Sequence, residues 1–339
     1  MEQSAVEVTG QAARSASISA IRLVAFLLIV SCHMLQYLRH ELAWWLNVGV
    51  QVFLCLSGYL YGQRRIADAL SFYAKRAKRI LIPYYVVLVP ALALGRLLWP
   101  AEWTAACAFK ALLCVDTIPG GGHLWFVPTI LMCYLLTPTL QMCCERALSR
   151  RRFLPGIVLL AALFAVGFGG FAPFFSPAWM TCYLLGYALG FAEARGARGG
   201  RWLAACVVAL SSLNLLQIYI QYIGRIKLYG LVELVYDLST DYNHVSLGVT
   251  LFLAFKWAFD RLRLERSAAL RALLSATDRY SYAGYLVHGF LILGPMSLME
   301  LTGSLAANIL IILAATALLA VLAQKAAAFL ERRLPGGAA

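Results

Sequence analysis

An arginine and a histidine lie eleven positions apart in one apolar run near the start of the chain, as Arg22 and His33. At 100° per residue this step closes about three helical turns, so both side chains share one face, about 16 Å apart along the axis. A neutral imidazole can take a proton from a hydroxyl and pass it on. We therefore expect His33 to act as a catalytic base and Arg22 to orient or pair with a cofactor, although Arg22 alone could simply snorkel to the membrane surface.

A second pair of arginines, Arg76 and Arg79, lies three positions apart in the segment FYAKRAKRILIPYY. Guanidinium groups match phosphate oxygens in a bidentate way, so this pair is suited to a phosphorylated cofactor. The alternative is an amphipathic segment that binds anionic lipid headgroups.

Further polar side chains interrupt other apolar runs, and an ionisable group at membrane depth is a candidate site residue. We expect possible contacts to an oxyanion or to an acceptor from Ser57, Tyr59, His123 and His288. His288 could equally hydrogen-bond a neighbouring helix, and the GxxxG steps at Gly58–Gly62 and Gly186–Gly190 are typical of helix packing. The nine cysteines lack metal-ligand spacing, so no metal is expected.

The composition indicates what kind of secondary structure carries these residues. The 339 residues are 62% hydrophobic and only 13% charged, which excludes an ordinary soluble enzyme. Apolar runs of about 20 residues are long enough to cross a bilayer. The sequence predicts an all-α polytopic membrane bundle of about ten transmembrane helices, at roughly 18–37, 43–62, 80–98, 124–144, 153–171, 178–194, 201–221, 243–259, 280–299 and 305–327.

The net charge of +13 then indicates topology. With ten spans and a cytoplasmic N-terminus, most basic residues fall in cytoplasmic segments, as the positive-inside rule requires. The exceptions are Arg22 within the first span and, on the other side, Arg39, Arg96, Lys110, Arg225 and Lys227. We expect a cytoplasmic tail at 1–17, a transmembrane domain at 18–330, a second cytoplasmic tail at 331–339, membrane lipids as partners and no nucleic acid.

In this order, the motifs resemble the integral membrane acyltransferase type 3 family. The resemblance rests on Arg22 with His33, the glycine- and serine-containing stretch 49–60, Arg76 with Arg79, HLWFV at 123–127, and SYAGYLVH at 281–288. It implies a bacterial inner-membrane enzyme that moves an acyl group, most often acetyl, from cytoplasmic acyl-CoA to a hydroxyl of an extracytoplasmic glycan or glycolipid. One departure is Gln51, where many members carry an Asp.

The acceptor itself is not evident from the sequence. The loop at about 222–242 carries five charged residues and four tyrosines, so we expect it to help choose the glycan, although an interfacial aromatic belt is an equal alternative. A secondary transporter or lipid-linked sugar flippase is the alternative function. Few intramembrane acids and no convincing inverted repeat argue against it.

Overall fold

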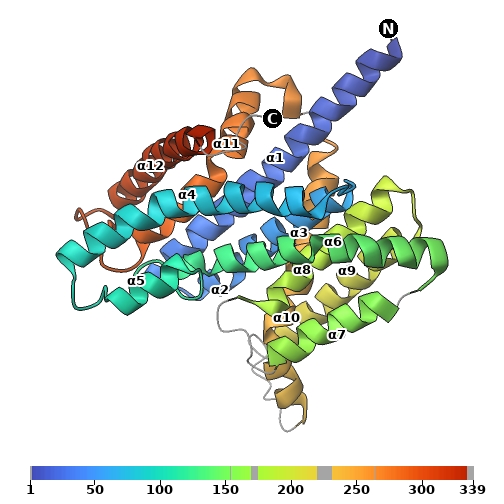
Figure 1. Ribbon diagram of the computed structural model, residues 1–339, viewed down its shortest axis with the longest axis horizontal. Helices are drawn as coiled ribbons and strands as arrows, with labels where there is room; N and C mark the ends of the chain where they lie inside the picture. The colour runs from blue at the N-terminus through green and yellow to red at the C-terminus, as the bar shows by residue number, and fades with distance from the viewer. Residues whose placement is uncertain (1, 153, 169–174, 220–230, 263, 334–339) are drawn as a thin grey trace.

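The computed structural model describes residues 2–152, 154–168, 175–219, 231–262 and 264–333, and within these ranges all regular structure is helical. Figure 1 shows a bundle in which α4 and α6 run side by side and α12 lies along α4. The helices are α1 Glu2–Tyr37, α2 Leu42–Leu46, α3 Gly49–Gly62, α4 Ala69–Leu98, α5 Ala105–Leu112, α6 Phe126–Arg150, α7 Leu154–Phe168, α8 Pro177–Ala194, α9 Gly199–Ile218, α10 Leu231–Phe259, α11 Ala268–Ile292 and α12 Leu305–Arg333, with 3-10 turns at Gly122–Trp125 (η1) and Leu264–Arg266 (η3).

Each of the ten expected segments overlaps a helix, but several boundaries were wrong. Helix α4 begins at Ala69 because the Asp68 carboxylate accepts hydrogen bonds from two backbone N–H groups of the first turn, at 3.2 and 2.9 Å. Helix α11 likewise begins at Ala268, where the Ser267 hydroxyl oxygen accepts from a backbone N–H at 3.3 Å, and it ends at Ile292 rather than 299. Polar caps therefore extend these helices beyond their apolar runs.

Six helices of the described residues are long and apolar enough to cross a membrane: Ala16–Tyr37, Leu42–Gly62, Ala69–Leu98, Gly122–Arg150, Gly199–Leu216 and Leu305–Arg333. Two shorter apolar helices occur at Leu154–Leu163 and His244–Phe259. The chain is therefore a membrane protein built from helices. Ten crossings, and the cytoplasmic placement of both termini, stay predictions.

The two GxxxG steps meet each other at the crossing of α3 and α8. A Cβ atom added at Gly58 or Gly62 would collide with the backbone carbonyl of Tyr183 or Tyr187 in α8. The relation is reciprocal, because a Cβ at Gly186 or Gly190 would collide with backbone carbonyls of α3. Small residues let the two backbones approach closely, which makes this pair the tightest helix contact of the bundle.

Helix α1 packs against both α3 and α11, and α11 also packs against α12. Close approaches hold these helices together: a Cβ at Gly49 of α3 would lie 2.7 Å from the carbonyl oxygen of Ala25 in α1. On α11, a Cβ at Gly284 would lie 3.2 Å from the ring of Phe26. Helix α1 is thereby fixed from two sides, and it carries Arg22 and His33.

The glycine crossing gives a direct test of this packing. We expect Gly58→Ala to destabilise the protein by about 1–3 kcal/mol, because the new methyl group meets rigid backbone rather than a flexible side chain. The measurement is thermal unfolding of the detergent-solubilised protein. The matched control is Gly156→Ala in α7, where a Cβ would meet nothing within 4 Å. Equal melting temperatures for the two variants would contradict this account of the crossing.

Candidate active site

Three histidines from three separate elements meet at one point of the bundle. His33 comes from α1, His123 from η1 and His288 from α11. The rings of His33 and His288 are stacked, with centroids 4.9 Å apart and planes 3° apart. The ring of His123 packs edge-on against both, at 6.0 Å from His33 and 5.2 Å from His288. The structure thus brings together three residues that the sequence placed far apart.

The hydrogen bonds of this cluster fix which nitrogen of each neutral ring carries the proton. The Nδ1 atom of His288 lies 2.6 Å from the carbonyl oxygen of Tyr285, which can only accept, so Nδ1–H donates. Nε2 of His288 is then an acceptor, and it lies 2.9 Å from Nδ1 of His33. His33 therefore donates through Nδ1–H, and its Nε2 atom carries a lone pair that meets no hydrogen-bond donor among the described residues, as a general base needs.

His123 supports this pair. Its Nε2–H donates to the carbonyl oxygen of Leu286 at 3.0 Å, and its own carbonyl oxygen accepts a hydrogen bond from the Tyr285 hydroxyl. Its ring packs on the backbone at Gly289, where a Cβ would collide with it. Because its donor hydrogen is engaged with α11, the ring braces the histidine pair, and an oxyanion contact from His123 stays a prediction.

Arg22 forms an ion pair with Asp278 of α11. The second oxygen of that carboxylate accepts a hydrogen bond from the Ser19 hydroxyl at 2.5 Å. The Arg22 side chain is 21% exposed, and it faces a cavity rather than the outer surface of the bundle. Arg22 thus has a protein partner as well as an open side.

The cavity beside Arg22 has a volume of about 280 Å³ and also holds the predicted arginine pair. Arg76 donates to the hydroxyl oxygen of Tyr61, and its Nε atom is buried without a partner among the described residues. Ser57 lines the same cavity. A neighbouring cavity of about 860 Å³ shares Arg76, Arg79 and Asp278 and adds further basic residues, namely Lys75, Lys78, Arg279 and Arg332. Together the two cavities form a basic cleft with room for a large anionic ligand.

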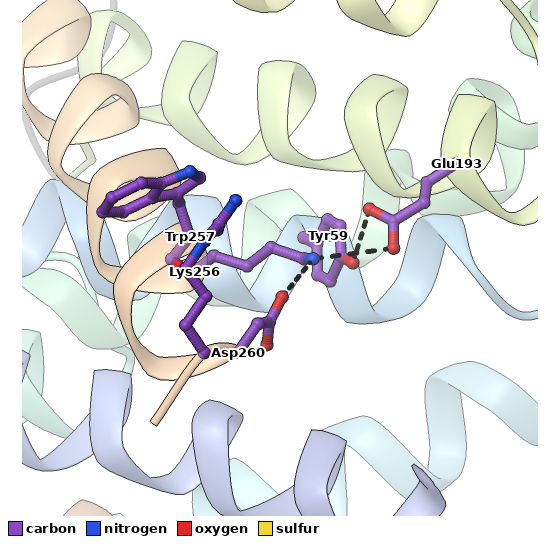
Figure 2. A network of polar contacts seen from close by, with 6 residues as sticks. Tyr59, Glu193, Lys256, Trp257 and Asp260 are labelled. Atoms are coloured by element: carbon purple, nitrogen blue, oxygen red, sulfur yellow. Dashed lines mark hydrogen bonds and ion pairs between the residues drawn. The ribbon is translucent and has the colours of Figure 1, made fainter. Parts of the chain in front are cut away.

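The structure does not bring Tyr59 to the histidines. Its hydroxyl donates to Glu193 Oε2 at 2.7 Å, and Lys256 lies 3.6 Å from the other oxygen of that carboxylate while it donates to Asp260 at 2.8 Å, as Figure 2 shows. This network ties α3, α8 and α10 together on the far side of α3. An oxyanion contact from Tyr59 therefore finds no support in its position.

Gln51 is fully buried where α3 begins. With its amide oriented to satisfy its hydrogen bonds, its nitrogen donates to the carbonyl oxygen of Asn47 at 2.8 Å. The side chain therefore caps the turn between α2 and α3, and it lies against Gly248 of α10. Of the expected acceptor loop at 222–242, residues 222–230 lie outside the described residues. Residues 231–242 belong to α10, so the prediction of a loop was wrong for that half.

The sequence reading missed Asp278, Tyr61 and Tyr285. Asp278 and Tyr285 lie on the same helix as His288, and either residue type is common where a helix meets its neighbours. Their spacing of seven residues, about two helical turns, could have indicated that both lie on one face of that helix. Among the described residues, no group of three or more His, Cys, Asp or Glu side chains has an arrangement that could hold a metal ion.

Comparison with known proteins assigns the chain to a family. Neither the search of curated proteins nor the search of solved structures found a match. A family model described as an acyltransferase domain matches residues 15–324, which include the three histidines, Arg22, Arg76 and Arg79. The chain therefore belongs to the acyltransferase type 3 family.

Proposed function

We propose that this membrane acyltransferase moves a short acyl group, acetyl in the first instance, from cytoplasmic acyl-CoA to a hydroxyl of an extracytoplasmic glycan or glycolipid. The single observation that carries the proposal is the hydrogen-bonded pair of His33 and His288, which leaves an unprotonated ring nitrogen about 16 Å along α1 from Arg22 of the basic cleft. The proposal includes a bacterial inner membrane and an orientation with the basic cleft on the cytoplasmic side.

The residues of the cleft fit the acyl donor. Coenzyme A carries several phosphate charges, and the buried Nε of Arg76 is a hydrogen-bond donor without a protein partner in the described part of the chain. Arg79 lines both cavities. We assign the phosphates to this arginine pair and the pantetheine arm to the path past Arg22 toward His33, a rise of about 16 Å along α1.

His33 then acts on the acceptor. Its Nε2 atom takes the proton of the acceptor hydroxyl while that oxygen bonds to the thioester carbonyl carbon. The carbon–sulfur bond breaks, its electron pair leaves with the CoA sulfur, and the proton passes from His33 to that sulfur. Each step is balanced without an oxidant, a metal or a second cofactor. Direct transfer needs no protein nucleophile, and Ser57 is close enough to the cleft to contact the donor instead.

The proposal also covers the choice of acceptor. We propose that residues 222–242, including the first turns of α10, take part in it. Swapping this segment with that of a relative of different acceptor preference, followed by mass spectrometry of the cell-surface glycans, tests the assignment. An unchanged product would overturn it.

Substitution of His33 tests the base. We expect His33→Ala to lower acyl transfer by about 10²–10⁴-fold, because the acceptor hydroxyl loses the base that takes its proton. Mass spectrometry of cell-surface glycans, with and without the variant gene, reads both the acyl mass and the acceptor. Cells that make the variant at normal levels and still acylate like the wild type would show that His33 is not the base.

The hydrogen bond between the histidines predicts a difference between two His288 variants. A glutamine carbonyl can accept the Nδ1–H of His33, whereas leucine cannot, so His288→Gln should keep clearly more activity than His288→Leu. Thermal unfolding of both variants serves as the control for folding. Equal activities at equal stability would show that His288 does not set the tautomer of His33.

The arginine pair should act on donor binding. We expect Arg76→Gln to raise KM for acyl-CoA by about 10–100-fold with a smaller change in kcat, because a charge-assisted hydrogen bond is worth about 1.5–3 kcal/mol. The matched control is Arg150→Gln at the exposed end of α6, outside the cleft. A fall in kcat at unchanged KM would remove Arg76 from the donor site.

A further inference from the structure

A small apolar void, called the passage below, adjoins the basic cleft and lies near the histidine pair. It is lined by residues of α1, α3, α6 and α11, namely Phe26, Ile29, Val50, Phe53, Phe126, Ser281, Tyr282 and Tyr285. Four of them also line the cavity of the arginines: Phe53, Phe126, Ser281 and Tyr282. At its other end, the ring of Phe26 lies 6.1 Å from that of His288, and the ring of Tyr285 lies 5.5 Å from it.

The passage is almost filled by its own walls. Its free volume is about 10 Å³, roughly the space of one water molecule. Both tyrosine hydroxyls point elsewhere: Tyr282 donates to the carbonyl oxygen of Ile80 at 3.0 Å, and Tyr285 donates to that of His123. The hydrogens of both hydroxyls are therefore engaged with backbone carbonyls and are not available as donors in the passage.

The walls cannot separate easily. Phe53 and Phe126 pack edge to face at 5.9 Å, and Phe126 packs against Tyr285 at 5.1 Å. Helix α3 meets the backbone of α1 at Gly49, and on α11 Gly284 lies against the ring of Phe26. Space for a longer group would have to come from displacement of buried side chains, which packed cores resist.

We infer that this passage sets the length of the acyl group, with Val50, Ile29 and Phe53 as specificity-determining residues. The inference rests on the proposed function, because it has the acyl end of acyl-CoA move from the basic cleft through the passage to reach His33. A group of acetyl size passes with small side-chain movements, whereas each further methylene meets the apolar walls. In a tight hydrophobic pocket one methylene changes kcat/KM by about 10–200-fold.

The test compares two valines of α3. Val50 lines the passage, whereas Val52 is equally buried in the same helix and does not line it. We measure kcat/KM of wild type, Val50→Ala and Val52→Ala with acetyl-, propionyl- and butyryl-CoA. The wild type should lose at least about tenfold per methylene. Val50→Ala should raise the butyryl-to-acetyl ratio by about tenfold or more, and Val52→Ala should leave that ratio at the wild-type value.

A milder pair of variants covers the case in which Val50→Ala fails to fold. Ile29→Val removes one methyl group from the opposite wall, and Ile21→Val removes the same group from a fully buried site of α1 outside the passage. Ile29→Val should raise the butyryl-to-acetyl ratio of kcat/KM, and Ile21→Val should leave it at the wild-type value.

The outcomes separate this inference from the proposed function. A wild type that uses butyryl-CoA as well as acetyl-CoA, or equal shifts for the lining and non-lining variants, would overturn the passage as the determinant of length while transfer still required His33. Acyl-CoA turnover that is absent, or that does not require His33, would overturn the proposed function together with the inference.

Discussion

Two polar pairs between α1 and α11 determine how the rest of the site is built. Arg22 pairs with Asp278, and His33 pairs with His288. The steps are eleven residues on α1 and ten on α11, so the two helices run parallel and the pairs lie at two levels about 15 Å apart. Side chains with unmet polar groups are costly inside a membrane bundle, so each pair disfavours sliding of one helix along the other. The apolar passage lies between these two levels.

The same arrangement explains how α1 contributes both to the basic cleft, through Arg22, and to the histidine cluster, through His33. Near Arg22 the bundle opens into a cleft that several cationic side chains line, whereas at His33 it closes around stacked and edge-on rings. The glycine crossing of α3 and α8 contributes indirectly, because it fixes α3, whose other face forms a wall of the passage through Val50 and Phe53. The network of Tyr59, Glu193 and Lys256 adds polar contacts to that crossing from the side away from the histidines.

The features of the fold and of the site that depend on a local period or spacing were predictable from the sequence. The Arg22–His33 stripe, the arginine pair and the two GxxxG steps all follow from the helical repeat, and apolar runs located every long helix approximately. Partners could not be predicted, because they depend on which helices meet. Asp278 pairs with Arg22, and the acceptor nitrogen of His288 pairs with His33, only because α11 packs against α1. Helix starts such as Ala69 were missed because caps, rather than hydrophobicity, decide them.

Under the proposed function, the closed passage also bears on why the acyl group goes to a sugar rather than to water. A thioester beside a general base is prone to hydrolysis unless the site excludes water. Here the passage holds about one water volume, and both of its tyrosine hydroxyls are occupied by backbone carbonyls. Water from the basic cleft therefore meets an apolar passage with room for about one molecule. The side chains that limit acyl length are then the same ones that favour transfer over hydrolysis.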